Sequence, residues 1–184
     1  WYHFPMERTL LGADEMRAIL ETAAARTVRG MGTARLAIVG IRKRGAVLAE
    51  RLREIIRANT GCEAPLGSLD ITLYRDDFST LGANPVVGGT DVLFDMDGRK
   101  VLLVDDVLYT GRTIRAALDA LTDLGRPAMV RLFVLVDRYH RELPIQADFA
   151  GRRVRTRVSE MGEVRVREID GRDEVVVMDR KRAP

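Results

Sequence analysis

The chain has 184 residues, 46% of them hydrophobic, which is enough apolar surface for one ordinary domain. Its 30 basic and 27 acidic residues give a net charge of +3 and a pI near 9.3, compatible with polyanionic partners. A single cysteine excludes an internal disulfide, and without a long apolar run or a signal-peptide pattern we expect a cytoplasmic protein with no membrane partner.

The first third of the chain predicts a helix, a strand and a second helix. Residues 1–5 precede Met6 and look like a cloning remnant or an extended start, so they receive no role. From Asp14 to Arg29 apolar residues recur at helical spacing, and Gly30 is a natural stop. The apolar run 36–41 then predicts a strand, the basic segment 42–45 a turn, and the spacing of apolar residues over 47–56 a helix.

The middle of the chain predicts a strand followed by a long loop. Leu69, Ile71 and Leu73 alternate with polar or small residues before Tyr74, which is typical of a strand that runs into a loop. Residues 78–90 contain three glycines and a proline with little periodicity. A loop of about a dozen residues in a compact domain is usually a lid or simply disordered.

The second half predicts alternating strands and helices. A core strand covers residues 100–104, a helix 113–124 and another buried strand 130–136, an order that favours a mainly parallel α/β sheet flanked by helices. Near the end, segments 164–168 and 174–178 flank Asp170-Gly171 and predict a pair of strands.

One segment carries the chemistry: a buried strand, two acids, a short loop and a helix start. It reads Asp105, Asp106, Val107, Leu108, Tyr109, Thr110, Gly111, Arg112 and Thr113. Ligands of open α/β folds lie at the carboxyl ends of the strands, so this loop should face a site. Adjacent carboxylates can accept hydrogen bonds from ribose hydroxyls, directly or through the shell of a Mg²⁺ ion. The loop from Thr110 to Thr113 can hold a phosphate with backbone N–H groups, hydroxyls and the helix dipole.

Simpler readings exist for each half of this segment. An aspartate before a helix often caps it, and Thr-Gly is common in turns. Other phosphate motifs fit worse, because the segment 40–45 lacks the ending of a nucleoside-triphosphate loop and Gly30-Met31-Gly32 opens no dinucleotide fingerprint. The complete run from strand to helix is more specific than either half.

That run resembles the motif of type I phosphoribosyltransferases that binds 5-phosphoribosyl-1-pyrophosphate (PRPP). Together with residues 69–77, 136–138 and 140–145, it is similar to the PyrR family, bacterial pyrimidine operon attenuators that also have uracil phosphoribosyltransferase activity. The similarity extends from about Leu36 to Met178. It implies one phosphoribosyltransferase domain over residues 1–184, with a small hood over the base within residues 137–160.

The resemblance also implies roles for particular residues. Residues 42–45 would form a pyrophosphate loop and a flexible lid would follow Arg75. We expect a catalytic group of Asp105, Asp106, Lys43 and Arg44, with further substrate contacts from Val107 to Thr113, Gly45, Arg75 and Arg138. Mg²⁺ would enter with PRPP near the two aspartates, and no direct protein ligand is assigned. Implied partners are PRPP, uracil, UMP or UTP, and a second copy of the chain in a homodimer or higher assembly.

The base specificity rests on Tyr109. Many purine-type relatives carry an acid immediately before the Thr-Gly pair, so a tyrosine there points to a pyrimidine. An orotate or purine phosphoribosyltransferase, or a regulator that senses nucleotides without catalysis, remains an alternative. His140 has no partner nearby in sequence, which favours packing or an RNA contact over a general base.

A second function, binding of pyrimidine-operon leader mRNA, is implied by the family. Family members use basic and polar residues on the first helix and after the hood, whereas this chain has Glu21, Thr22, Ala24, Ala25 and Gln146. Basic residues that can contact RNA backbone are Arg141, Arg152, Arg153, Arg155 and Arg157, extended by Arg165 and Arg167. The alternative is a solvated basic face.

Overall fold

The structure is a computed structural model that describes residues 7–75 and 89–179. Its elements in chain order are β1 (Arg8–Leu11), α1 (Ala13–Met31), β2 (Leu36–Ile41), α2 (Arg44–Thr60), β3 (Leu66–Leu69), the 3-10 turn η1 (Thr72–Tyr74), β4 (Lys100–Leu108), α3 (Arg112–Asp123), β5 (Met129–Asp137), β6 (Phe149–Arg153), β7 (Glu160–Arg165), α4 (Arg167–Asp170) and β8 (Glu174–Asp179). Within the described residues, no helix is both long enough and apolar enough to cross a bilayer.

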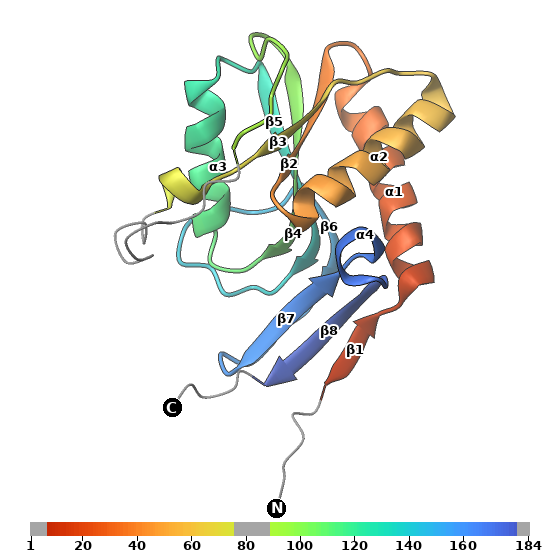
Figure 1. The fold of residues 1–184 in the computed structure, drawn as a ribbon, viewed down its shortest axis with the longest axis vertical. Helices are drawn as coiled ribbons and strands as arrows, with labels where there is room; N and C mark the ends of the chain where they lie inside the picture. Colours follow the sequence, from red (N-terminus) through yellow and green to blue (C-terminus); the bar gives the residue numbers. More distant parts are fainter. Residues whose placement is uncertain (1–6, 76–88, 180–184) are drawn as a thin grey trace, which may run out of the picture.

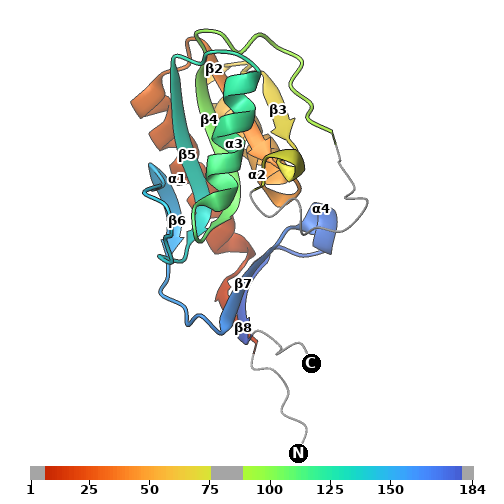
Figure 2. The same ribbon diagram turned by 90° about the vertical axis from the view of Figure 1, so that its left-hand side faces the viewer.

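The centre of the molecule is a parallel sheet of five strands in the order β3-β2-β4-β5-β6. Helices α1 and α2 cover one face and α3 covers the other (Figures 1 and 2). This is the mainly parallel α/β sheet flanked by helices that the sequence predicts. Because the strands are parallel, the carboxyl ends of β2, β4 and β5 meet at the same edge of the sheet.

The core lies on both faces of this sheet, which explains why its central strands are continuous apolar runs. On the side of α1 and α2, Leu20, Leu48 and Phe133 are buried in one cluster. On the side of α3, Leu103 and Leu121 belong to a second cluster. Every residue of β2 is buried.

A second, antiparallel sheet lies beside the carboxyl edge of the first and has the order β1-β8-β7 (Figure 1). The sequence predicts a hood over residues 137–160, but residues 149–153 form β6 and pair in parallel with β5 in the main sheet. The small sheet instead combines the two ends of the described chain. Strand β1 has four residues and was not predicted, because so short a segment has no periodicity to detect.

The predicted strand 36–41 is confirmed, and the strands predicted at 100–104 and 130–136 are longer than expected. Strand β4 continues through both aspartates to Leu108. The extension follows from pairing, because Asp105 and Val107 still lie in register with Val134 and Val136 of β5. The two acids therefore lie within the last part of the strand, where backbone pairing fixes them.

Helix α1 passes the expected stop at Gly30 and ends at Met31. Gly32 follows with φ of +67°, and its N–H donates to the Val28 carbonyl, so the glycine that ends the helix lies two positions later than predicted. Helix α2 likewise begins inside the predicted basic turn, at Arg44.

The strand expected through Leu69, Ile71 and Leu73 ends at Leu69. The Asp70 carboxylate accepts hydrogen bonds from the Thr72 backbone N–H at 2.9 Å and from the Thr72 hydroxyl at 2.5 Å, which turns the chain into η1. Leu73 is consequently exposed, at 59%. Most of the predicted lid, residues 78–90, lies outside the part of the chain that the structure describes.

The expected strand 164–168 is also corrected. Strand β7 ends at Arg165 and α4 follows, because the Asp170 carboxylate accepts the Val166 backbone N–H at 2.8 Å and closes a helical turn. The antiparallel pairing of this region with β8 is confirmed.

Candidate active site

The two acids of the motif lie at the carboxyl end of β4, in the middle of the main sheet. Asp105 is 5% exposed and Asp106 is half-buried. The Asp105 Oδ1 accepts the Asp106 backbone N–H at 2.9 Å, and the Asp106 Oδ1 accepts the Val107 N–H at 2.8 Å. Each carboxyl is thus oriented by the backbone of the next residue.

Burial disfavours the charged form of both carboxyls, and the charge of Asp106 adds to this effect at Asp105. Burial raises the pKa of Asp105 well above its ordinary value, and the charge of Asp106 raises it further. The pKa of Asp106 is also raised by burial, while the Val107 N–H and the positive charge of Arg44 act in the opposite direction. Hydroxyl donors or a cation placed here would relieve the same penalty, so the pair is suited to a polyhydroxylated or cationic ligand.

The loop after β4 leads directly into the amino end of α3. Gly111 has φ of +94°, a conformation that favours glycine, and α3 begins at Arg112. The Arg112 N–H donates to the Thr110 hydroxyl at 3.3 Å. The first turn of α3 contains no acidic side chain, so its N–H groups and dipole are available to an anion. Thr113 is exposed at this end.

The remaining predicted residues of the motif contact other parts of the chain, and their contact with substrate stays a prediction. Leu108 is 1% exposed and Val107 is half-buried against the core below α1 and α2. Arg112 pairs with Glu142 at 2.6 Å, with both side chains about half exposed. The Thr110 carbonyl accepts N–H groups of Glu142 and Leu143, so the segment after β5 supports the back of the phosphate loop.

The predicted pyrophosphate loop lies against the end of β4 through a glycine. A methyl group at Gly45 would lie 2.7 Å from the Val104 carbonyl oxygen and 3.1 Å from the Asp105 Cα. Gly40, at the end of β2, is equally restricted, since its methyl group would lie 2.4 Å from the Ala46 Cα. Only glycines let the start of α2 approach the end of β4 this closely.

The two cations of this loop that we expect in the catalytic group differ in environment. Lys43 is exposed. Arg44 is half-buried and donates from Nε and Nη2 to the Asp170 carboxylate of α4 at 3.1 and 2.8 Å. The bond with Asp170 raises the pKa of Arg44, and the charges of Asp106 and Glu163 add to it. The Asp170 contact was not predicted, because the pair is separated by 126 residues in sequence.

Arg138 lies between the main sheet and the small sheet. It is 5% exposed, and its guanidinium lies 4.2 Å from the centre of the Tyr109 ring. Its Nε donates to the Thr156 hydroxyl at 2.9 Å and its Nη2 to the Glu160 carbonyl at 2.6 Å. These contacts connect Tyr109, the residue before the phosphate-binding loop 110–113, to β7. A role for Arg138 in substrate binding stays a prediction.

His140 packs in the same region. Its ring lies 5.0 Å from the Tyr109 ring, and its Nε2 lies 2.7 Å from the Thr156 carbonyl oxygen, consistent with a donated hydrogen bond. The expectation of packing over general-base chemistry fits this position, and Tyr109 is enclosed by His140 on one side and Arg138 on another.

Arg141, predicted to contact RNA, is an internal brace. Its guanidinium donates to the Tyr109 carbonyl at 2.8 Å, the Ile145 carbonyl at 2.7 Å and the Asp137 carboxylate at 2.7 Å. Asp137 is 4% exposed, so the pair neutralises a buried charge. With these hydrogen bonds made inside the chain, Arg141 is poorly placed to bind RNA.

The other predicted RNA contacts differ in their environments. Arg152 pairs with Glu15 of α1 at 3.1 Å, and Arg165 lies 13% exposed among Glu7, Glu163 and Glu174. Arg153 borders a small pocket of about 190 Å³ next to Asp137 and Arg141. Arg155 and Arg157 line a pocket of about 590 Å³ together with Arg8. Arg167 donates its backbone N–H to the Asp173 carboxylate.

Arg75, which we expect to contact substrate, is exposed at the edge of the described chain.

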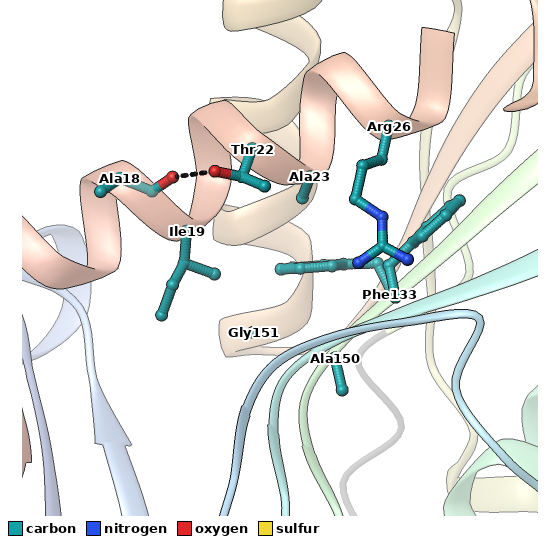
Figure 3. A pocket seen from close by; sticks show the side chains of 9 residues that line it. Ala18, Ile19, Thr22, Ala23, Arg26, Phe133, Ala150 and Gly151 are labelled. Carbon is teal, nitrogen blue, oxygen red and sulfur yellow. Dashed lines mark hydrogen bonds between the residues drawn. The ribbon is translucent and has the colours of Figure 1, made fainter. Parts of the chain in front are cut away.

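A separate groove of about 300 Å³ lies between α1 and the edge strand β6 (Figure 3). Arg26 lies 5.1 Å from the centre of the Phe149 ring, and Thr22 donates its hydroxyl to the Ala18 carbonyl at 2.9 Å. Ile19 and Ala23 complete a largely apolar lining. The two polar side chains that line this groove thus contact a ring and a carbonyl of the chain itself.

Comparison with known proteins agrees with this geometry. Residues 9–167 match the phosphoribosyl transferase domain family. The chain is 53% identical over 173 residues to the bifunctional protein PyrR of Chloroflexus aurantiacus, covering 94% of this chain and 95% of the relative. It is 53% identical over 175 residues to the bifunctional protein PyrR of Thermus thermophilus, covering 95% of this chain and 97% of the relative.

Solved structures share the fold at low sequence identity. The hypoxanthine phosphoribosyltransferase of Trypanosoma cruzi superposes with a TM-score of 0.71 at 15% identity, covering 94% of this chain and 96% of that one. That of Staphylococcus aureus gives 0.68 at 18% identity, covering 95% and 93%. Taken with the extended identity to the curated relatives, these matches place the chain in the PyrR family of bifunctional proteins, within the phosphoribosyl transferase domain family.

Proposed function

We propose that the chain transfers the phosphoribosyl group of PRPP to uracil and releases UMP and pyrophosphate. The observation that carries this proposal is the meeting of three parts at one edge of the sheet. These are the Asp105–Asp106 pair, the anion-binding start of α3, and the basic loop that Gly45 brings against β4. Membership of the PyrR family supports the same reaction.

Each part suits one section of PRPP. Asp105 and Asp106 would accept the ribose hydroxyls, and the segment from Thr110 to Thr113 would hold the 5′-phosphate. Lys43 and Arg44 would stabilise the charge that develops on pyrophosphate as its bond to the anomeric carbon breaks. Since the transition state is close to an oxocarbenium ion, the protein's task is to position the reactants and to stabilise charge.

Mg²⁺ fits this site as an ion brought in by the substrate. Among residues 7–75 and 89–179 there is no cluster of three or more His, Cys, Asp or Glu side chains that could hold a metal, so the described chain builds no complete cage. Mg²⁺ typically keeps several waters and binds one or two carboxylates together with substrate phosphates. Asp105 and Asp106 would hold it in this way, and when bound it neutralises phosphate charge.

Tyr109 supports a pyrimidine as the acceptor base. It occupies the position before Thr110 where purine-type relatives carry an acid, and its ring is held between Arg138 and His140. A neutral ring fixed in this way offers no carboxylate to a purine nitrogen. A purine substrate is therefore the weaker alternative, and orotate, which is also a pyrimidine, is distinguished from uracil by experiment.

We expect incubation with PRPP, Mg²⁺ and labelled uracil to yield UMP, whereas orotate, hypoxanthine and xanthine give at most a few per cent of that product. Chromatographic separation of the four reactions measures this directly. Equal or greater product from hypoxanthine or xanthine would exclude the pyrimidine assignment, and equal or greater product from orotate would replace uracil by another pyrimidine. No product from any base would leave a regulator that binds nucleotides without catalysis.

RNA binding is a second candidate function, favoured by the pocket that Arg8, Arg155 and Arg157 share. Three arginines around one opening can contact successive phosphates. The partner would be a pyrimidine-operon leader hairpin, as the family resemblance implies. Because Glu21, Ala25 and Gln146 replace basic or polar contacts, we expect only a small preference for such a hairpin over a scrambled RNA.

Changing Arg155 and Arg157 to alanine together should weaken RNA binding and flatten its salt dependence. Each lost phosphate contact removes about 0.7 from the log-log slope for single-stranded RNA. Arg152→Ala is the matched control, because Arg152 already pairs with Glu15 and should change the slope little. Filter binding at several salt concentrations measures both quantities. A slope unchanged in the double variant would place the RNA elsewhere.

A further inference from the structure

The short helix α4, next to the small sheet, contacts the pyrophosphate loop through the carboxylate of Asp170. Asp170 receives two hydrogen bonds from the Arg44 guanidinium, at 3.1 Å from Nε and 2.8 Å from Nη2. The side chains of Asp170 and Arg44 are 17% and 31% exposed, respectively. Glu163 of β7 lies farther from the same guanidinium, at 3.9 Å. Arg44 is therefore held chiefly by the two-point contact with Asp170.

Asp170 is itself fixed in place and charged. Its Oδ2 also accepts the Val166 backbone N–H at 2.8 Å, which orients the carboxylate from the start of α4. The hydrogen bonds from Arg44 lower the pKa of Asp170 below its ordinary value. A fixed anion bound to two nitrogens of a planar guanidinium restricts the rotation of that group far more than a single contact would.

The contact with Asp170 leaves one nitrogen of the Arg44 guanidinium without a hydrogen bond inside the described chain. Asp170 occupies Nε and Nη2, and Nη1 makes no hydrogen bond to any residue in the described ranges. The next residue, Gly45, lies against the end of β4, where an added methyl group would be 3.1 Å from the Asp105 Cα, so Arg44 begins α2 beside the acids of β4. An anion that binds beside these acids would thus be near a guanidinium whose position Asp170 already restricts.

We infer that Asp170 is the positioning residue for Arg44, holding its guanidinium ready for the pyrophosphate of PRPP. This inference rests on the proposed phosphoribosyl transfer. Pre-orienting a flexible side chain reduces the ordering cost that a ligand must otherwise meet, so its effect should appear in affinity for pyrophosphate. Asp170 need not touch the substrate to act in this way.

A neighbouring ion pair supplies the matched control. Arg51 of α2 donates to Glu168 at 2.6 Å and to Asp173 at 2.7 Å, which ties the same α4 region to the same α2 helix. Glu168→Gln therefore disturbs the contact between α4 and α2 without removing the partner of Arg44. If α4 served only as a structural support, Glu168→Gln and Asp170→Asn would have similar effects on the site.

The test is calorimetric titration of the full chain with inorganic pyrophosphate and Mg²⁺, using the parent, Asp170→Asn, Arg44→Ala, their double variant and Glu168→Gln. We expect Asp170→Asn to weaken binding about three- to tenfold, since one charged hydrogen-bond partner is lost. The same change should have no further effect in the Arg44→Ala background. Glu168→Gln should bind like the parent.

Kinetics with PRPP and uracil separate positioning from general damage. Asp170→Asn should lower kcat/KM for PRPP by at least the same factor, while KM for uracil changes by less than about twofold. If Asp170→Asn does not fold, Asp170→Glu takes its place. This change keeps the charge but moves the carboxylate by one methylene, so we expect a roughly twofold loss in pyrophosphate affinity.

Several outcomes would overturn the inference. They are parent-like pyrophosphate affinity in the Asp170 variant, an effect that persists without Arg44, and a parent chain that binds no pyrophosphate. Failure of the proposed function is distinguishable, because it appears as absence of UMP from uracil in the parent. The pyrophosphate titration still decides the role of Asp170 in that case.

Discussion

Asp105→Asn is expected to make the ligand-free protein more stable while weakening its binding of PRPP and Mg²⁺ by about 10- to 100-fold. Burial and the neighbouring Asp106 raise the pKa of Asp105 well above its ordinary value, so its charged form opposes folding. An amide removes that charge and keeps the oxygen that accepts the Asp106 N–H. Hydrogen bonds between charged groups and a ligand contribute about 1.5–3 kcal/mol each, which sets the expected loss of affinity.

The sign of the pH dependence follows from the same shift. With a folded pKa above the unfolded one, the folded state holds more protons between the two values. Stability therefore falls as pH rises from the ordinary value of 3.8 up through the raised pKa of Asp105. In Asp105→Asn part of this fall in stability should be absent. At neutral pH the melting temperature of the variant should therefore exceed that of the parent, by about 2–4 °C per kcal/mol for a chain of this size.

Thermal unfolding between about pH 4 and pH 8, together with titration of PRPP, tests both halves of the prediction. Asp119→Asn, an exposed change on α3, is the control and should leave PRPP affinity close to that of the parent. A variant that melts lower than the parent at neutral pH would show that the Asp105 carboxylate contributes to the fold. Unchanged PRPP affinity would remove Asp105 from the site.

The sequence was sufficient to predict the main sheet, because each central strand is a continuous apolar run bounded by turn residues. Strand β2 is buried along its whole length, which requires the uninterrupted run at 36–41. The pair Asp105–Asp106 could be located for a related reason: strand, acids, glycine and helix are contiguous, so local sequence contains the complete motif.

Contacts between distant segments could not be predicted in this way. Asp170 reads as part of a turn, and only the packing of α4 against α2 brings it to Arg44, 126 residues away. Arg141 looks like one more exposed arginine until the fold places Asp137, Tyr109 and Ile145 around it. Whether a charged residue stabilises the core or binds a ligand depends on the residues that surround it in space. The adjacent residues in the sequence do not reveal that surrounding.

In the small sheet, β8 was predicted, whereas β1 was missed and β7 was located only in part, for a different reason. Strand β1 has four residues, and β7 contains glycine and acidic residues that weaken its alternating pattern. Their backbone conformation is determined by pairing with β8 more than by local preference. The family resemblance placed the hood in residues 137–160, whereas the small sheet joins the two ends of the described chain.

Gly45→Ala is expected to separate the pyrophosphate loop from the acids of β4 and to abolish measurable phosphoribosyl transfer. The added methyl group would lie 2.7 Å from the Val104 carbonyl oxygen and 3.3 Å from the Asp105 Oδ1, and the first of these neighbours is backbone that cannot rotate away. Either α2 or β4 must shift, and overpacking of this kind typically costs about 1–3 kcal/mol of stability.

The loss of activity should be larger than the loss of stability explains, because a displacement of about 1 Å at a reacting group can lower the rate by about two orders of magnitude. Gly30→Ala is the matched control: it also places alanine in a helix, but its methyl group meets only the Phe149 ring at 4.0 Å. That variant should keep parent-like activity and gain up to about 1 kcal/mol from better helix propensity. Rates of UMP formation and unfolding free energies of both variants measure the contrast. Parent-like turnover in Gly45→Ala would mean that Lys43 and Arg44 do not need their close approach to Asp105 for transfer.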